Sequence, residues 1–367
     1  MNAILASRPQ RTSGFTLVEL MIAMALGLLV IASAITVFSG SRKSIELNSA
    51  LTDIQDSARF AMDTITRDIR MSGFQGCVDI NTLAAKIYAD EAPTTDYFNT
   101  AITASVIEDA GIWNPEQPIG FDIPNDRAVP VPGTHALSVQ FGSPETYTFT
   151  PMATIDADIV LDVEDAMLVE GDLALISNCQ VADIFAVTSY SGSTIQHTAS
   201  RNSDKRLSAP YGLAGADNRA RIMRFEANIY YIGDTNRVND HGDRIFSLYK
   251  QTLPYSNDNL PIEMIEGVAN LQIRLGFRDS ENTHNEGLTF VSPDDADTTP
   301  GRIDVVQFGL LMQSYDSVLE ADDTSTYFIA GTRLLPKEEP FDSSIAYASD
   351  RRMKLAFNTT VKIRNRR

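Results

Sequence analysis

The chain has 367 residues, 43% of them hydrophobic, which is enough for one large domain or two ordinary ones. Its 48 acidic residues outnumber its 30 lysine and arginine residues and give a formal charge of -18. Such a charge repels phosphates, so we expect no nucleic acid bound directly by a basic patch. The two cysteines are too few for a four-thiolate zinc site but suit one disulfide in an oxidising compartment.

The first predicted element is an apolar helix over residues 15–38, in which Glu19 is the only charged residue. At a rise of about 1.5 Å per residue this range is long enough to cross a hydrocarbon core of about 30 Å. Arg8 and Arg11 precede it, so the positive-inside rule places the amino terminus in the cytoplasm and the bulk of the chain outside. The predicted topology is a single membrane pass.

A cleaved signal peptide is the alternative interpretation of this apolar range. Its length exceeds the usual apolar region of about 7–15 residues in such peptides. A carboxylate inside the membrane also costs roughly 2.5–3.5 kcal/mol. A segment that is discarded has no reason to carry the cost of Glu19, so we favour a retained anchor.

The helical period continues over residues 39–73 as an amphipathic half of the same helix. One apolar stripe and an opposite charged face predict that a single side of this half packs against a soluble domain. Gly73 and Gly76 are expected to end the helix. The stripe consists of Leu47, Leu51, Ile54, Ala58, Ala61, Ile65 and Ile69, and the charged face of Arg42, Glu46, Asp53, Asp56, Arg59, Asp63, Arg67 and Asp68.

Behind the short basic leader, residues 14–20 read GFTLVEL, which resembles the class III signal of type IV pilins and pseudopilins. The resemblance implies that a prepilin peptidase removes the cytoplasmic leader, residues 1–14, by cleaving between Gly14 and Phe15. It also implies N-methylation of Phe15. Glu19 would then act in subunit assembly by neutralising the α-amine of Phe15 in the next subunit. Snorkelling of Glu19 to the cytoplasmic interface is the alternative.

The length of the chain and later stretches resemble PilW-type minor pilins in particular. The stretches are residues 59–77, 177–185 and 364–366. This resemblance implies a structural, non-enzymatic role in type IV pilus assembly, in a tip-located initiation complex that supports pilus biogenesis, twitching motility and adhesion. The implied partners are the prepilin peptidase, other minor pilins, the major pilin and the inner membrane. The head would lie in the periplasm before assembly and on the extracellular pilus afterwards.

Residues 74–367 are expected to form an extracytoplasmic, β-rich head. Residues 78–135 contain many prolines and no sustained period, so we predict an irregular, loop-rich insertion with one short helix. Beyond them, short apolar or alternating segments predict strands. These are residues 136–141, 157–161, 173–177, 182–189, 223–231, 244–250, 266–277, 302–313 and 355–363. The expected fold class is α+β, pilin-like, with the long helix laid across one face of an antiparallel sheet.

Cys77 and Cys179 are expected to form a disulfide, because neither has a metal-type spacing with a second Cys or His and the head should lie outside the cytoplasm. Two unrelated buried thiols are the alternative. We expect no metal and no cofactor. Residues 234–243 are rich in oxygen ligands but lack the acidic twelfth position of an EF-hand, so a hairpin loop is favoured over calcium. Surface positions are expected for His135, His197, His241 and His284.

Three rival functions stay open at this point. A minor pseudopilin of a type II secretion system shares the peptidase signal. A membrane-tethered adhesin that does not polymerise would leave Glu19 without a role. An extracytoplasmic enzyme has no support, since the sequence contains no GxSxG, P-loop, HExxH or GxGxxG motif.

Overall fold

The structure, a computed structural model, describes residues 14, 16–80, 82–94, 96–121, 127–213, 220–253, 260–278, 287–298, 302–337 and 346–365. Phe15 and His284 lie outside the described residues. The chain divides into two compact units, Met1–Ser49 and Ala50–Arg367, and helix α1 (Leu17–Met71) belongs to both.

The amino-terminal unit contains the apolar part of α1. Among the described residues, α1 is the one helix that is long and apolar enough, by length and composition, to cross a membrane. The side chains from Leu17 to Phe38 are all exposed. Apolar side chains exposed around a whole helix are typical of a segment that faces lipid.

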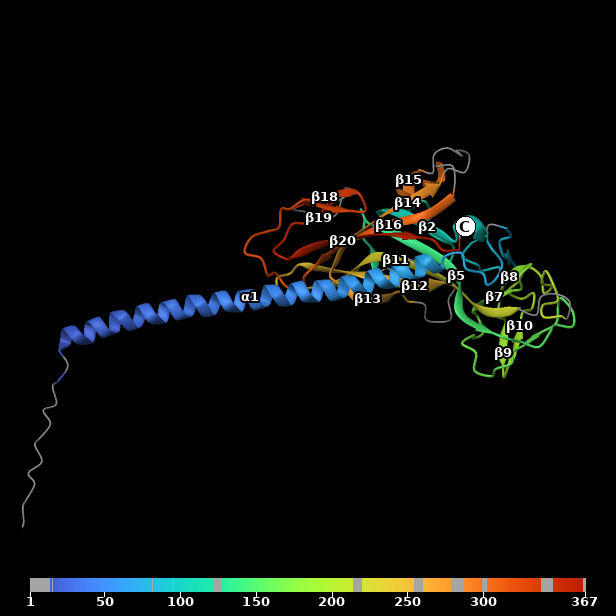
Figure 1. The fold of residues 1–367 in the computed structure, drawn as a ribbon, viewed down its shortest axis with the longest axis horizontal. Coiled ribbons are helices and arrows are strands. Elements are labelled where there is room, and N and C mark those ends of the chain that lie inside the picture. Colours follow the sequence, from blue (N-terminus) through green and yellow to red (C-terminus); the bar gives the residue numbers. More distant parts are fainter. Residues whose placement is uncertain are drawn as a thin grey trace, which may run out of the picture. The chain divides into compact units, whose positions relative to one another are not determined.

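The second unit is a head built mainly of antiparallel sheets, which confirms the α+β class (Figure 1). Its largest sheet has the order β1-β8-β7-β11-β5-β2-β3, with β4 and β12 paired to β11 and β13 paired to β12. Its strands are β1 (Lys86–Ile87), β2 (Ile102–Asp109), β3 (Ile112–Asn114), β4 (Val129–Pro130), β5 (His135–Tyr147), β7 (Leu173–Ser177), β8 (Ala182–Ala186), β11 (Arg221–Val238), β12 (Arg244–Leu253) and β13 (Ile262–Glu266). The pair β1–β8 is parallel, unlike the others in this sheet.

A second sheet has the order β15-β14-β16-β20, and two smaller sheets have the orders β6-β10-β9 and β17-β18-β19. The strands are β15 (Leu288–Val291), β14 (Val268–Arg278), β16 (Arg302–Gln313), β20 (Lys354–Lys362), β6 (Ile159–Val160), β10 (Thr194–Gln196), β9 (Ser189–Ser191), β17 (Tyr327–Ile329), β18 (Thr332–Lys337) and β19 (Ala346–Ala348). Two short helices, α2 (Tyr97–Thr100) and η1 (Pro293–Thr298), complete the described elements. The sequence predicted a single sheet, whereas the head contains several.

The carboxyl-terminal turns of α1 lie alongside β5, β11 and β12 and enter the main core (Figure 1). Ile54, Ile65 and Ile69 are at most 3% exposed and share one cluster with apolar residues of β5, β14 and β16. Burying an isoleucine contributes roughly 1.5–3 kcal/mol, so the stripe is a large source of head stability. The predicted apolar stripe is confirmed from Ile54 to Ile69.

The prediction of an irregular insertion over residues 78–135 was partly wrong. The range contains the expected short helix α2, but it also contains β2, which pairs with β5 inside the largest sheet. Ile102 and Ala104 of β2 are buried in the main core. The alternating pattern of β2 was visible in the sequence. It was overlooked because of the prolines that follow β2, which belong to a later connection and not to the strand.

Candidate functional site

The amino terminus of α1 carries a capping box made by Thr16 and Glu19. The Thr16 backbone N–H donates to Glu19 Oε2 (3.0 Å), and the Glu19 backbone N–H donates to Thr16 Oγ1 (3.2 Å). The Thr16 hydroxyl also donates to Glu19 Oε2 (3.1 Å). Reciprocal bonds of this kind satisfy backbone donors that a helix start leaves free. Glu19 therefore has a hydrogen-bond partner, Thr16, within its own subunit. The T-x-x-E spacing of these two residues is typical of a capping box, and our sequence interpretation missed it.

Asp68 fastens the other half of α1 to the head. Its Oδ2 accepts hydrogen bonds from Tyr230 OH (2.6 Å) and Asn228 Nδ2 (2.9 Å) of β11, and it lies 3.4 Å from Lys250 Nζ of β12. Asp68 is 2% exposed, so its expected place on the solvent face was wrong. Burial first, and then the charge of Asp68, raise the pKa of Tyr230 and keep it a donor.

The carboxyl-terminal end of α1 is closed by groups distant in sequence. Gly73 follows the helix with a φ of 75° and donates from its N–H to the carbonyl of Gln140 (2.9 Å). Asn365 Nδ2 lies within hydrogen-bond distance of the carbonyls of Arg70 (3.3 Å) and Met71 (3.1 Å), and so caps the free end. The predicted stop at Gly73 is confirmed. No local sequence pattern predicts that Asn365 caps the helix.

A disulfide joins Cys77, six residues beyond the end of α1 at Met71, to Cys179 between β7 and β8, with a Cα–Cα distance of 4.9 Å. The segment before it passes very close to β7: a Cβ at Gly76 would lie 2.2 Å from Ser177 Oγ, and Gly76 has a φ of 83°. Only glycine suits both conditions. The helix end is thus held to the sheet by a covalent bond and by close backbone packing.

Two of the histidines, His135 and His197, are not at their expected surface positions. His135 is 4% exposed and His197 is 1% exposed, while His241 is exposed. The Ile273 N–H donates to His135 Nδ1 (3.0 Å), and burial lowers the pKa of His135 to about 4. His135 therefore links β5 to β14 as a neutral ring. The sequence around it is polar and turn-like, which hid the burial.

Residues 234–243 comprise the end of β11 and the turn, residues 239–243, that leads into β12, so they belong to a hairpin, as predicted. Asn239 organises it, because its Oδ1 accepts from the N–H groups of His241 (3.0 Å) and Asp243 (2.9 Å). No group of three or more His, Cys, Asp or Glu side chains suited to a metal ion occurs in the part of the chain that the structure describes.

Comparisons with known proteins find matches to the amino-terminal region of the chain and to the second half of the head. A family model described as "Type IV Pilus-assembly protein W" matches residues 229–365, and one described as "Prokaryotic N-terminal methylation motif" matches residues 9–35. "Pilin-like protein PilA3" of Thermus thermophilus is 35% identical over 60 residues, 16% of this chain and 26% of the relative. The chain thus spans about a quarter of that relative's length.

With an apolar helix that begins in the range matching the N-methylation motif and ends in the core of an antiparallel head, the chain is similar to type IV pilin-like proteins. The match over residues 229–365 runs from β11 to Asn365, the residue that caps α1. Within the pilin-like class, the chain is similar to PilW-type minor pilins.

Proposed function

We propose that the chain is a minor pilin that takes part in type IV pilus assembly, anchored in the inner membrane by α1 before it is incorporated. The observation that carries the proposal is the carboxylate of Glu19, which stands in an exposed apolar helix within the range that matches the methylation motif. The PilW match over residues 229–365 supports a pilus rather than a secretion pseudopilus.

In the proposed filament, Glu19 pairs with the α-amine of Phe15 of a neighbouring subunit after cleavage behind Gly14. Two unit charges about 4 Å apart attract by roughly 4 kcal/mol at an effective dielectric constant near 20. That energy is comparable to the roughly 2.5–3.5 kcal/mol that a carboxylate costs in the membrane. Pairing can therefore offset the cost of burying Glu19 among packed helices.

The capping box supplies a second, local role for the same carboxylate, so the test must separate the two. Glu19→Gln removes the charge but keeps a residue that suits the third position of a capping box. Glu19→Val removes the charge and the cap. Thr16→Ala is the matched control, because it removes the Thr16 hydroxyl and keeps the charge. The readout is the amount of each variant that co-purifies with sheared pili, measured against its amount in the membrane.

We expect Glu19→Gln and Glu19→Val to insert in the membrane and to be absent from pili, and Thr16→Ala to be incorporated. Normal incorporation of Glu19→Gln would reduce Glu19 to a helix cap and would overturn charge pairing. Amino-terminal sequencing with and without prepilin peptidase accompanies the assay. A mature start at Phe15 is expected, and a start near residue 35 would mean ordinary secretion.

We further propose that the head lies in the periplasm before assembly and at the pilus tip afterwards, together with other minor pilins and the major pilin. The size of the head supports this position, because a large head is hard to repeat along a closely packed filament. The disulfide fits an oxidising compartment. Gold labelling confined to pilus ends, and loss of twitching and adhesion on deletion, are the expected results. Even labelling along pili would refute a tip position.

A further inference from the structure

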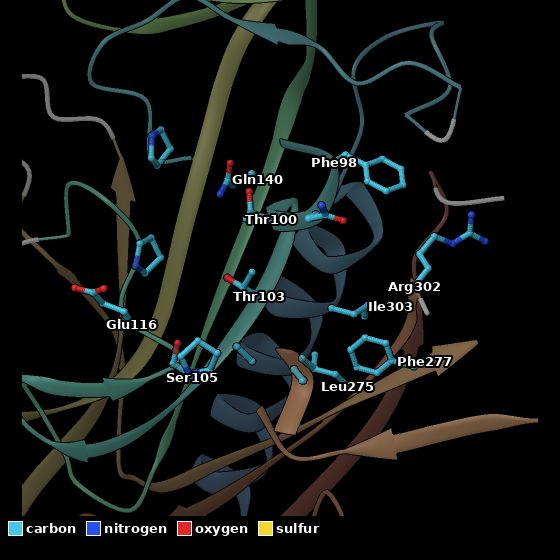
Figure 2. Close-up of a pocket in the computed structure, with 16 residues that line it drawn as sticks. Phe98, Thr100, Thr103, Ser105, Glu116, Gln140, Leu275, Phe277, Arg302 and Ile303 are labelled. Carbon is cyan, nitrogen blue, oxygen red and sulfur yellow. The ribbon is translucent and has the colours of Figure 1, made fainter. Parts of the chain in front are cut away.

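A cavity of about 450 Å³ opens beside strand β2 in the head. Thr103 and Ala104 of β2 and Gln140 of β5 line one part of it, and Leu275, Phe277 and Ile303 line another. Figure 2 shows Thr103 between these groups, with the apolar side chains of Ile303, Leu275 and Phe277 on the side away from Glu116. The volume is within the range of about 300–1,000 Å³ typical of ligand sites.

The backbone of β2 presents an unpaired edge to this cavity. The Gln140 N–H donates to the carbonyl of Ala101 (2.8 Å), and the Ile107 N–H donates to the carbonyl of Thr134 (2.9 Å). Since alternate residues of a strand direct their N–H and C=O groups to opposite sides, Ala104 directs its pair away from β5. Within the described residues, Ala104 has no backbone partner on this outer edge.

The neighbouring strand β3 ends before it reaches Ala104. The pairing of β3 with β2 begins at Val106 and Asn114, so its extension would bring the residues after Asn114 alongside Ala104. Pro115 and Pro118 occupy that stretch and line the cavity. Continued register would place Glu116 opposite Ala104, but β3 ends at Asn114, and among the described residues Glu116 makes no backbone hydrogen bond to Ala104. Ala104 is 3% exposed, and an unpaired backbone group at such a buried place costs free energy.

Gln140 adds a second unsatisfied group. It is 1% exposed, and its Oε1 has no hydrogen-bond partner among the described residues. Buried side-chain amides are nearly always bonded, so the position of Gln140 at the cavity points to a ligand with a donor group. The two sides of the cavity thus differ: Thr103 and Gln140 are polar, whereas Leu275, Phe277 and Ile303 are apolar.

We propose that this cavity binds an extended peptide segment of another protein chain, which pairs with the outer edge of β2 at Ala104. Side chains of an added strand alternate between its two faces. One set meets Thr103 and Gln140, and the other meets Leu275, Phe277 and Ile303. The segment that fits therefore alternates polar and apolar residues. The inference uses residues of the head alone and does not depend on the role of Glu19.

The test uses the full chain in detergent micelles and the capped peptide acetyl-TVTVT-amide. Binding is followed by amide hydrogen exchange and by the NMR shift of the Ala104 N–H. Two further peptides carry N-methyl groups on either the valines or the threonines, so that each lacks the N–H donors of one edge. We expect the parent peptide to slow exchange at Ala104, and one N-methylated isomer alone to lose roughly tenfold or more in affinity.

Variants of the chain test the same contact from the other side. Ala104→Pro removes the outward N–H without touching the bonds to β5, and should weaken the parent peptide roughly tenfold. Gln140→Met removes the amide and should weaken it severalfold, which keeps the test informative where the proline variant does not fold. Thr103→Val keeps the shape and the backbone N–H and serves as the control.

Several results would overturn the proposal. One is equal affinity of all three peptides, or an equal loss of affinity in both N-methylated isomers. Another is unchanged affinity in Ala104→Pro and Gln140→Met. Absence of peptide binding, or occupation of the cavity by a neutral oligosaccharide with no change in exchange at Ala104, would likewise exclude a strand-binding groove.

Discussion

The buried carboxylate of Asp68 is expected to be a main attachment of α1 to the head, and Asp68→Ala tests it. The substitution removes the carboxylate that accepts from Tyr230, Asn228 and Lys250. Tyr230 and Asn228 are both 0% exposed. A hydrogen bond to a charged group contributes about 1.5–3 kcal/mol. Breaking a buried charged pair costs about 3–5 kcal/mol. Since the three contacts share one carboxylate and are not additive, we expect a loss of about 3–5 kcal/mol.

The assay is urea unfolding of the full chain in micelles, followed by the fluorescence of Trp113, the single tryptophan, which is 7% exposed in the head. Asp63→Ala is the matched control, because Asp63 is exposed on the same helix and the gain in helix propensity is identical. Tyr230→Phe completes a double-mutant cycle with Asp68→Ala, for which we expect a coupling of about 1.5–3 kcal/mol.

If Asp68→Ala lowers the free energy of unfolding no more than Asp63→Ala does, Asp68 is not a main attachment of α1. A coupling with Tyr230 close to zero would likewise refute this role, because the short hydrogen bond would then contribute nothing to stability. A loss of about 3–5 kcal/mol is a large share of the roughly 5–15 kcal/mol that stabilises an ordinary domain. Correct folding of the double variant would keep the cycle interpretable.

Three further predictions concern the head. Gly76→Ala should destabilise it by more than Gly120→Ala in thermal unfolding, because both have positive φ but a Cβ at Gly120 meets open space; equal losses would show that the close approach is harmless. Cys77→Ser should lower stability by about 2–5 kcal/mol, and a reductant should lower the unfolding midpoint of the parent chain and not that of the variant. The pKa of His135 is depressed to about 4 from 6.5, so stability is present above pH 6.5 and falls as the pH drops towards 4; His135→Asn should flatten this dependence and His241→Asn should not.

The parts of the fold that sequence predicts well are those with a strong local period. The stripe from Ile54 to Ile69 lies where helical spacing placed it, and the strands β7 and β16 lie where short apolar runs placed them. Each depends on the chemistry of neighbouring residues alone. The stop at Gly73 belongs to the same group, since a positive φ is a local property.

The parts that sequence did not predict depend on contacts between distant segments. Asp68 carries a charge at a helical position next to the apolar stripe, and its burial follows from Tyr230 and Asn228 far along the chain. The cap from Asn365 and the burial of His135 beside Ile273 are of the same kind. Partner identity across hundreds of residues leaves no periodic signal in a single sequence.

The attachment of the second half of α1 has a mechanical consequence. The apolar side chains from Ile54 to Ile69, the bonds of Asp68 and the disulfide at Cys77 lie along successive turns of the same helix and beyond its end. A tensile force along this part of the helix is therefore shared by all of them at once. Rupture requires sliding the whole helix out of the head in shear, which resists load better than peeling contacts apart one by one.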